Sequence, residues 1–235
     1  MDEMKWNNKS EVRLHFIMAL AGGFFGGYAV FGRMGVFGSA QTANLIDLVG
    51  DILGSDLVDA AERLGALVIY ISAMIIFAVL SRKTKWNLKY LVFAVETVAV
   101  VILAALPEKL DPVVALYPVF FATSFQWCVF KGAEGYACST IFSTNNLKQT
   151  VLSFANYFLA DGENAKEREE RRESLKKGCF FGITLLCFHM GVGIAFLGVR
   201  SLGLAAVWLQ LVFVLAGLGM TGIQDRKIRK RDWKE

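Results

Sequence analysis

The chain has 235 residues, of which 55% are hydrophobic, and its mean hydropathy is +0.46. Ordinary soluble domains are less apolar, so this composition indicates a protein that lies in a bilayer. The formal net charge is only +4, and no basic stripe is interleaved with aromatic residues, so nucleic acid is excluded as a partner. The expected fold class is an all-α integral membrane protein.

Six apolar runs are long enough to cross a membrane as helices, which takes about 20 residues each. Among Asp, Glu, Lys and Arg, only Glu96 falls within them. The predicted spans are Leu14–Gly32, Leu64–Ser81, Tyr90–Pro107, Pro112–Phe130, Gly178–Val199 and Ser201–Gln224.

Two further segments, Thr42–Leu53 and Thr144–Ala160, begin with the same phrase, Thr-x-Asn-Leu. The first segment would rise only about 18 Å as a helix. It is therefore expected to enter the membrane part-way or to lie along it, as a half-helix. Thr42 and Thr144 are of the residue types preferred at the N-cap, and we expect them to cap these two helices.

The distribution of basic residues favours six spans over eight. If neither Thr-x-Asn helix crosses, 21 of the 25 Lys and Arg residues fall on the side of the two termini. Basic loops stay in the cytoplasm, so both termini are expected there. If both helices crossed, the basic loop Arg82–Lys89 would face outside.

Three spans and one half-helix in each half make the two halves an inverted repeat, since an odd number of crossings reverses the direction of entry. Residues 1–107 form the first repeat, 112–225 the second and 226–235 a basic cytoplasmic tail. The mixed-charge stretch 161–177 is expected to be a solvated cytoplasmic insertion in the second repeat.

The two Thr-x-Asn starts are the first candidate for a solute site. A helix N-terminus carries unpaired N–H groups and a partial positive charge, and in inverted-repeat transporters such ends hold anionic groups near the midplane. The alternative is that these residues only cap and pack two re-entrant helices. The candidate solute-binding residues are Gln41, Thr42, Asn44, Thr144, Asn145 and Asn146, with Tyr28 and Gln126 from the spans.

Three charged residues are candidates for charge recognition or coupling. An ionisable residue inside a span is costly, so Glu96 is expected either to carry a proton or to pair with a neighbouring helix. Arg33 and Lys131 each follow the helix that precedes a Thr-x-Asn copy. They are expected to attract an anion or, alternatively, to extend to the membrane interface.

Catalysis and metal binding are not expected. The four cysteines form no CxxC pair, and His15 and His189 are too scattered for a metal site, so no cofactor is predicted. The chain also lacks a Ser/His/Asp set or a suitably placed pair of acids, so we do not expect an enzyme.

Two sequence motifs resemble the signatures of the YoaK-like family, which comprises bacterial membrane proteins of unknown function. The stretch Arg33–Leu45 resembles the first signature, an Arg-Gly-Gly-Val-Phe pattern followed by Gln-Thr-Gly-Asn. The second signature is matched by Gln126, Phe130, Lys131, Gly135, Tyr136 and the run Ser143–Lys148. The resemblance covers nearly the whole chain and implies a multi-pass protein of the bacterial cytoplasmic membrane.

The chain departs from the family pattern at three positions. Ala43 and Asn145 replace the middle glycine of the two Thr-Gly-Asn phrases, and Gly26 stands where many relatives carry Asp. The resemblance therefore implies the architecture more firmly than a mechanism.

Two functions remain open. The first is a small transporter or channel, with a small-molecule solute that is anionic if the helix starts bind it, and with a homodimer as a further expectation. The second is a non-transporting membrane scaffold that binds a partner through 161–177 and the basic tail.

Overall fold

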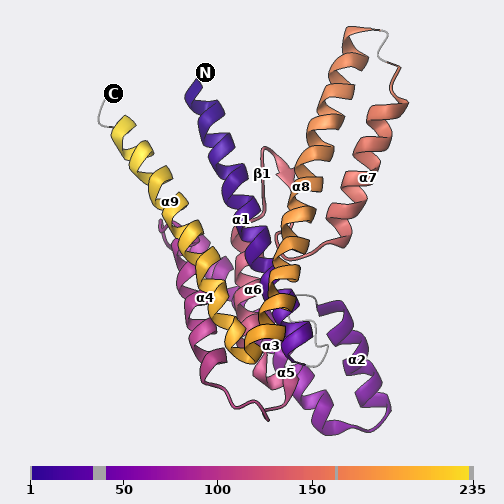
Figure 1. Cartoon of the computed structure of the whole chain (residues 1–235), viewed down its shortest axis with the longest axis vertical. Helices are drawn as coiled ribbons and strands as arrows, with labels where there is room; N and C mark the ends of the chain where they lie inside the picture. Colours follow the sequence, from indigo (N-terminus) through magenta and orange to yellow (C-terminus); the bar gives the residue numbers. More distant parts are fainter. Residues whose placement is uncertain (1, 34–40, 162–163, 233–235) are drawn as a thin grey trace.

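The computed structural model describes residues 2–33, 41–161 and 164–232, and these residues are almost entirely helical (Figure 1). The expected helical class is confirmed. The elements are α1 (Asp2–Gly32), α2 (Gln41–Leu53), α3 (Leu57–Lys83), α4 (Leu88–Ala105), α5 (Pro112–Ala115), α6 (Tyr117–Val129), the strands β1 (Gly132–Ala133) and β2 (Tyr136–Ala137), α7 (Thr144–Leu159), α8 (Ala165–Leu202), the 3-10 helix η1 (Gly203–Leu209) and α9 (Gln210–Asp232).

The long helices alternate in direction. In Figure 1, α1 descends from the N-terminus, α3 rises, α4 descends, α6 rises, α8 descends, and α9 rises to the C-terminus. The start of α1 and the end of α9 therefore lie at the same end of the molecule as the end of α7 and the start of α8. The two short helices run apart from the middle of the molecule, α2 downward and α7 upward.

Four helical stretches in the described chain are long and apolar enough to cross a membrane: Lys9–Gly32, Leu57–Lys83, Leu88–Ala105 and Ala165–Lys227. The first three coincide with the first three predicted spans. The fourth, of 63 residues, contains the last two predicted spans, because α8, η1 and α9 follow one another without a polar break.

The fourth predicted span, 112–130, is wrong as a single helix. Asp111 caps α5 by accepting hydrogen bonds from the N–H groups of Val113 (2.7 Å) and Val114 (3.0 Å). The backbone then leaves α-helical geometry at Leu116 (φ −91°, ψ 3°). Pro118 has no N–H with which to continue the helical hydrogen bonds across this break, and a new helix, α6, starts beside it.

The boundaries predicted for the last two spans also need correction. α8 runs unbroken from Ala165 to Leu202, so the charged stretch 161–177 is largely the first part of the same 38-residue helix that contains the fifth predicted span. Gly203 ends this helix at a positive φ of 57°, which glycine adopts without strain. The apolar sequence then forms η1, and α9 starts only at Gln210.

Glycines bring α1 and α8 into close contact at the centre of the fold. A Cβ atom at Gly23 would overlap the backbone of Phe188, and one at Gly191 would overlap the carbonyl oxygen of Leu20. Small residues at such crossings let two helix backbones approach each other, which favours dispersion contacts where no hydrophobic driving force is available. This contact fixes where α8 crosses α1.

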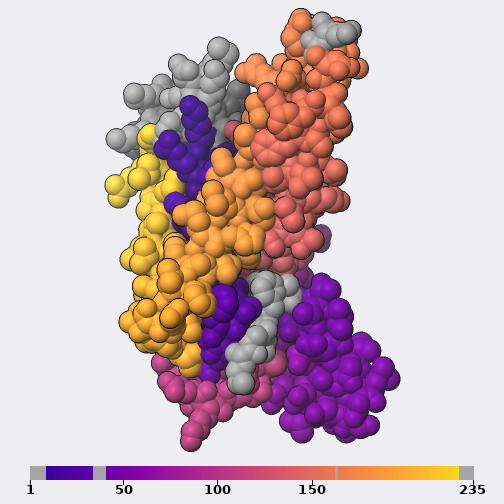
Figure 2. Space-filling model, turned by 45° about the vertical axis from the view of Figure 1, so that its right-hand side comes forward, coloured from indigo at the N-terminus to yellow at the C-terminus, as the bar shows by residue number. Residues whose placement is uncertain are grey.

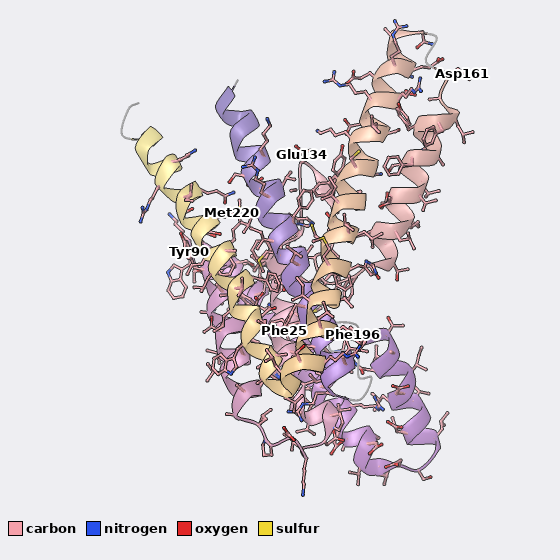
Figure 3. All side chains as sticks on the ribbon, in the orientation of Figure 1. Phe25, Tyr90, Glu134, Asp161, Phe196 and Met220 are labelled. Carbon is pink, nitrogen blue, oxygen red and sulfur yellow. The ribbon has the colours of Figure 1, made fainter. Side chains whose placement is uncertain are left out.

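The short hairpin of β1 and β2, which follows α6 in the chain, contacts the upper part of α8 through its side chains. Figure 3 labels Glu134 in the turn between β1 and β2, and its carboxylate lies 3.4 Å from the Lys176 ammonium of α8. The Tyr136 hydroxyl donates to the Glu173 carboxylate. Burial raises the pKa of Tyr136, so the hydroxyl keeps the proton that it donates. These contacts orient the solvated part of α8.

Gly191→Ala is expected to lower the free energy of unfolding by about 1–3 kcal/mol, because the added methyl group forces α1 away from α8. Gly193→Ala is the matched control on the same helix. A Cβ there meets nothing within 4 Å, and alanine favours the helix by about 1 kcal/mol at most. Thermal unfolding of the purified protein in detergent measures both variants. Equal stability of the two would contradict a close α1–α8 crossing.

Candidate functional site

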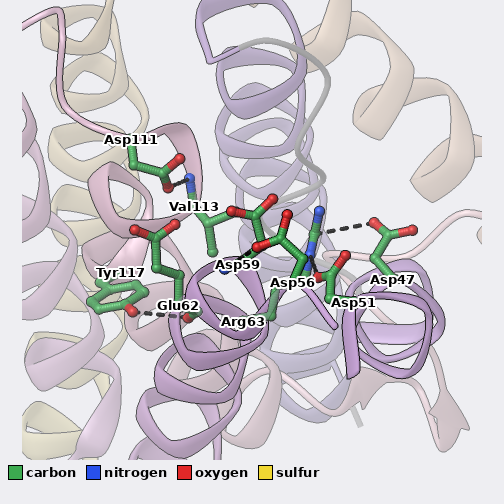
Figure 4. Close-up of polar contacts among 9 residues, drawn as sticks. All are labelled: Asp47, Asp51, Asp56, Asp59, Glu62, Arg63, Asp111, Val113 and Tyr117. Atoms are coloured by element: carbon green, nitrogen blue, oxygen red, sulfur yellow. Dashed lines mark hydrogen bonds and ion pairs between the residues drawn. The ribbon is translucent and has the colours of Figure 1, made fainter. Parts of the chain in front are cut away.

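A charged contact holds α2 against α3. The Arg63 guanidinium of α3 lies 3.1 Å from the carboxylate of Asp47 and 2.7 Å from that of Asp51, both on α2 (Figure 4). The opposite face of α2 exposes apolar side chains, among them Ile46 and Leu53. Hydrophobic exposure of this kind suits contact with lipid.

In Figure 1 the N-terminal ends of α2 and α7 are the ends of these two helices that lie nearer to each other, and α7 lies above α2 in Figure 2 as well. At these starts Thr42, Thr144 and Asn145 are exposed, whereas Asn44 and Asn146 are buried. The two members of each Thr-x-Asn pair therefore have different surroundings.

The prediction that Thr42 and Thr144 are N-caps is wrong. Both lie inside the helices, since α2 starts at Gln41 and α7 at Thr144. Ser143 occupies the N-cap of α7, and its side chain makes no capping hydrogen bond. At α7 the physical reason is that Asn146, a residue further into the helix, hydrogen-bonds the backbone carbonyls of the loop that leads into it.

Asn146 ties down the loop before α7. Its amide nitrogen donates to the carbonyl oxygens of Ser139 (2.7 Å) and Phe142 (3.0 Å). Its amide oxygen accepts from the thiol of Cys138 at 3.3 Å. Burial raises the pKa of this thiol to about 12, so it is neutral and retains the proton to donate. Asn146 is fully buried, and these contacts occupy both amide hydrogens, which leaves none for a solute.

Gln126 and Tyr28 connect elements inside the bundle. The amide nitrogen of Gln126 donates to the Met18 carbonyl (2.8 Å) and to the Thr140 hydroxyl (2.9 Å), so it joins α6 to α1 and to the loop before α7. The Tyr28 hydroxyl donates to the Leu204 carbonyl at 3.2 Å and joins α1 to η1. These bonds join elements of the bundle to one another, although the Gln126 amide oxygen is buried without a partner.

Arg33 and Lys131 have opposite surroundings. Lys131 is exposed, and its ammonium lies 5.0 Å from the centre of the Phe77 ring. The Arg33 side chain is buried, with 2% of its surface exposed, and donates through Nη1 to the carbonyls of Pro107 (3.3 Å) and Glu108 (3.2 Å). Among the described residues no carboxylate forms an ion pair with it, and its Nε and Nη2 atoms are buried without partners.

Two more polar groups inside the protein lack a full set of partners. Both amide atoms of Gln41, at the start of α2, are buried without a hydrogen bond. Glu96 of α4 is fully buried, and its Oε2 atom accepts from the Gln210 amide nitrogen of α9 at 3.0 Å. Sequence analysis did not identify Gln210 as this partner, because 114 positions separate the two residues and no local pattern connects them.

Its long apolar helices, together with the polar groups buried between them, identify the chain as a helical, membrane-like protein. It belongs to the DUF1275 family, described as a protein of unknown function, whose sequence pattern matches residues 14–220. That stretch includes all of the candidate site residues named above. No curated protein and no solved structure matches the chain.

Asn146→Asp is expected to destabilise the protein by about 1–3 kcal/mol, because a carboxylate cannot donate to the carbonyls of Ser139 and Phe142 and both of these hydrogen bonds are lost. Asn145→Asp, the adjacent and exposed position, adds the same charge and serves as the control. Thermal unfolding in detergent, with hydrogen exchange of residues 138–146, measures the change. Unaltered exchange in Asn146→Asp would rule out the role of its side chain in holding the loop.

Proposed function

We propose that the chain is a small transporter or channel for a small anionic solute in the bacterial cytoplasmic membrane, with six spans, two half-helices and both termini in the cytoplasm. In this proposal α8 and α9 are separate spans, and α5 with α6 forms one interrupted span. The solute passes near the facing starts of α2 and α7.

The directions of the helices support two halves of opposite orientation. In Figure 1, α1 and α2 run downward, α3 upward and α4 downward. In the second half α6 and α7 run upward, α8 downward and α9 upward. Each element of the first half thus has a counterpart with the reverse direction, which is the arrangement of inverted-repeat transporters with discontinuous helices at the solute site.

The buried guanidinium of Arg33, which lacks an anionic partner among the described residues, is the observation that supports an anionic solute. A buried cation is costly unless it is paired, and this guanidinium has two carbonyl partners but no carboxylate among the described residues. Guanidinium groups bind carboxylate and phosphate oxygens through two parallel hydrogen bonds, for which Nε and Nη2 are suitably spaced. Gln41, whose amide is also unpartnered, lies eight positions further along the chain and supplies a donor at the start of α2.

The protruding pair of helices α7 and α8 favours the second function, that of a membrane scaffold. A hollow of about 430 Å³ lies between them, and its lining is mixed in charge. Figure 3 labels Asp161 at the far tip of this pair, away from the bundle. A scaffold would be recovered in mild detergent with a stoichiometric partner and would show no solute flux in liposomes. A transporter gives the reverse outcome.

Arg33→Gln is expected to reduce anion flux by about ten- to a hundredfold, which corresponds to the loss of one charged hydrogen-bonding group worth about 1.5–3 kcal/mol. Glutamine keeps an amide donor for the loop carbonyls, so the fold should persist. Flux of chloride, phosphate and acetate is measured in proteoliposomes, and the thermal shift caused by each anion is measured in detergent.

Arg200→Gln is the matched control, since Arg200 is an exposed arginine in the last turn of α8, and its removal lowers the surface charge equally. It should leave flux unchanged. The proposal fails if none of the three anions moves through the wild-type protein, or if Arg33→Gln and Arg200→Gln behave alike.

A further inference from the structure

Glu96 and Gln210 are a buried pair in which one hydrogen bond is present and two acceptor atoms remain unused. The Gln210 amide nitrogen donates to Glu96 Oε2 at 3.0 Å. Glu96 Oε1 and Gln210 Oε1 are both buried without a partner. Neither side chain is exposed to solvent. If Glu96 were ionised, both of these unused atoms could only accept, and neither could satisfy the other.

A single proton removes this conflict. A protonated carboxyl group has one O–H donor, and an amide oxygen is its natural acceptor. An acid and an amide can then exchange two hydrogen bonds, N–H to carboxyl oxygen and O–H to amide oxygen. The bond from the Gln210 amide nitrogen to Glu96 is already the N–H bond of such a pair. The O–H bond would join the two unused atoms, Glu96 Oε1 and Gln210 Oε1.

Among the described residues, Glu96 has no ion pair and no charged hydrogen-bond partner that would stabilise its ionised form. The elements that pack most extensively against α4 are α6, α9 and η1, and η1 contains no titratable residue. The titratable residues of α6 are Tyr117 and Cys128, at its two ends, whereas Glu96 is at the middle of α4. On α9 the titratable residues begin at Asp225, about 22 Å along the helix from Gln210.

Within α4, Phe93 precedes Glu96 by one helical turn and Val100 follows it by one, and each is buried in a hydrophobic cluster. Apart from Tyr28 and Tyr70, the buried residues of the cluster that contains Val100 are apolar. Tyr28 of α1 shares one of these clusters, but its hydroxyl proton is donated to Leu204. Asp225, at the far end of α9, accepts from Tyr90 at the start of α4.

We propose that Glu96 and Gln210 form a proton-binding site, in which Glu96 is protonated in this conformation and releases the proton when α4 and α9 separate. The O–H bond of the carboxyl group breaks, the proton passes to water that enters between the helices, and the carboxylate is left hydrated. As a deepening of the proposed transport function, this site couples anion movement to protons.

Infrared spectroscopy of the whole protein in a lipid bilayer tests the site without reference to transport. The wild-type protein should show the band of a protonated carboxyl group at neutral pH. Glu96→Gln should remove that band, yet keep the fold, because a glutamine at this position can form both hydrogen bonds with Gln210. Glu169→Gln, which removes an exposed carboxylate from α8, should leave the band in place. Gln210→Leu should shift its frequency, since the carboxyl group loses its acceptor.

Absence of the band at neutral pH, or its persistence in Glu96→Gln, would overturn the proton site. Coupling is then tested in proteoliposomes that contain a pH-sensitive dye, with chloride, phosphate and acetate as probes. Wild-type protein should move protons together with the anion, and Glu96→Gln should move the anion with at least a tenfold smaller proton signal. Equal proton signals would overturn coupling. If none of the anions moves, the proposed function fails, while the infrared result still decides on Glu96.

Discussion

The need to satisfy backbone polar groups where the chain leaves helical geometry governs this structure. In an apolar surrounding an unpaired N–H or C=O group costs several kcal/mol, so irregular backbone is tolerated only where side chains satisfy it. The fold leaves helical geometry between α6 and α7 and between α4 and α5, and in each place a buried side chain donates to the freed carbonyls. Asn146 does so for Ser139 and Phe142, and Arg33 for Pro107 and Glu108.

The same requirement separates residues that hold the fold from residues that are left free to act. The amide of Asn146 makes all of its contacts with other groups of the chain, so the role of this residue is structural. Arg33 uses one nitrogen and leaves two without partners. Lys131, the other basic residue that follows a helix leading to a Thr-x-Asn phrase, is exposed and needs no partner. The surroundings of the two basic residues therefore differ, and only Arg33 keeps unpaired donors inside the protein.

Sequence patterns predicted the features that depend on local composition. Apolar length located the first three spans, and the Thr-x-Asn phrase located the starts of α2 and α7 to within one residue. The break at Leu116 and the start of α9 were missed, because uninterrupted apolar sequence does not reveal where a chain turns. The partners of Asn146 and Gln210 were also beyond the sequence. The contacts of Asn146 depend on the path of an irregular loop, and the partner of Gln210 depends on which helix the packing brings within 3.0 Å.

The two functional proposals meet in one element, α4. Glu96 lies at the middle of this helix, and the carbonyls that hold Arg33 follow directly after its end. A helix moves largely as a rigid body, so separation of α4 from α9 would carry Pro107 and Glu108 with it. The partners of Arg33 would then change as Glu96 loses its proton. By linkage the proton and the anion must influence each other's binding equally, whichever moves first.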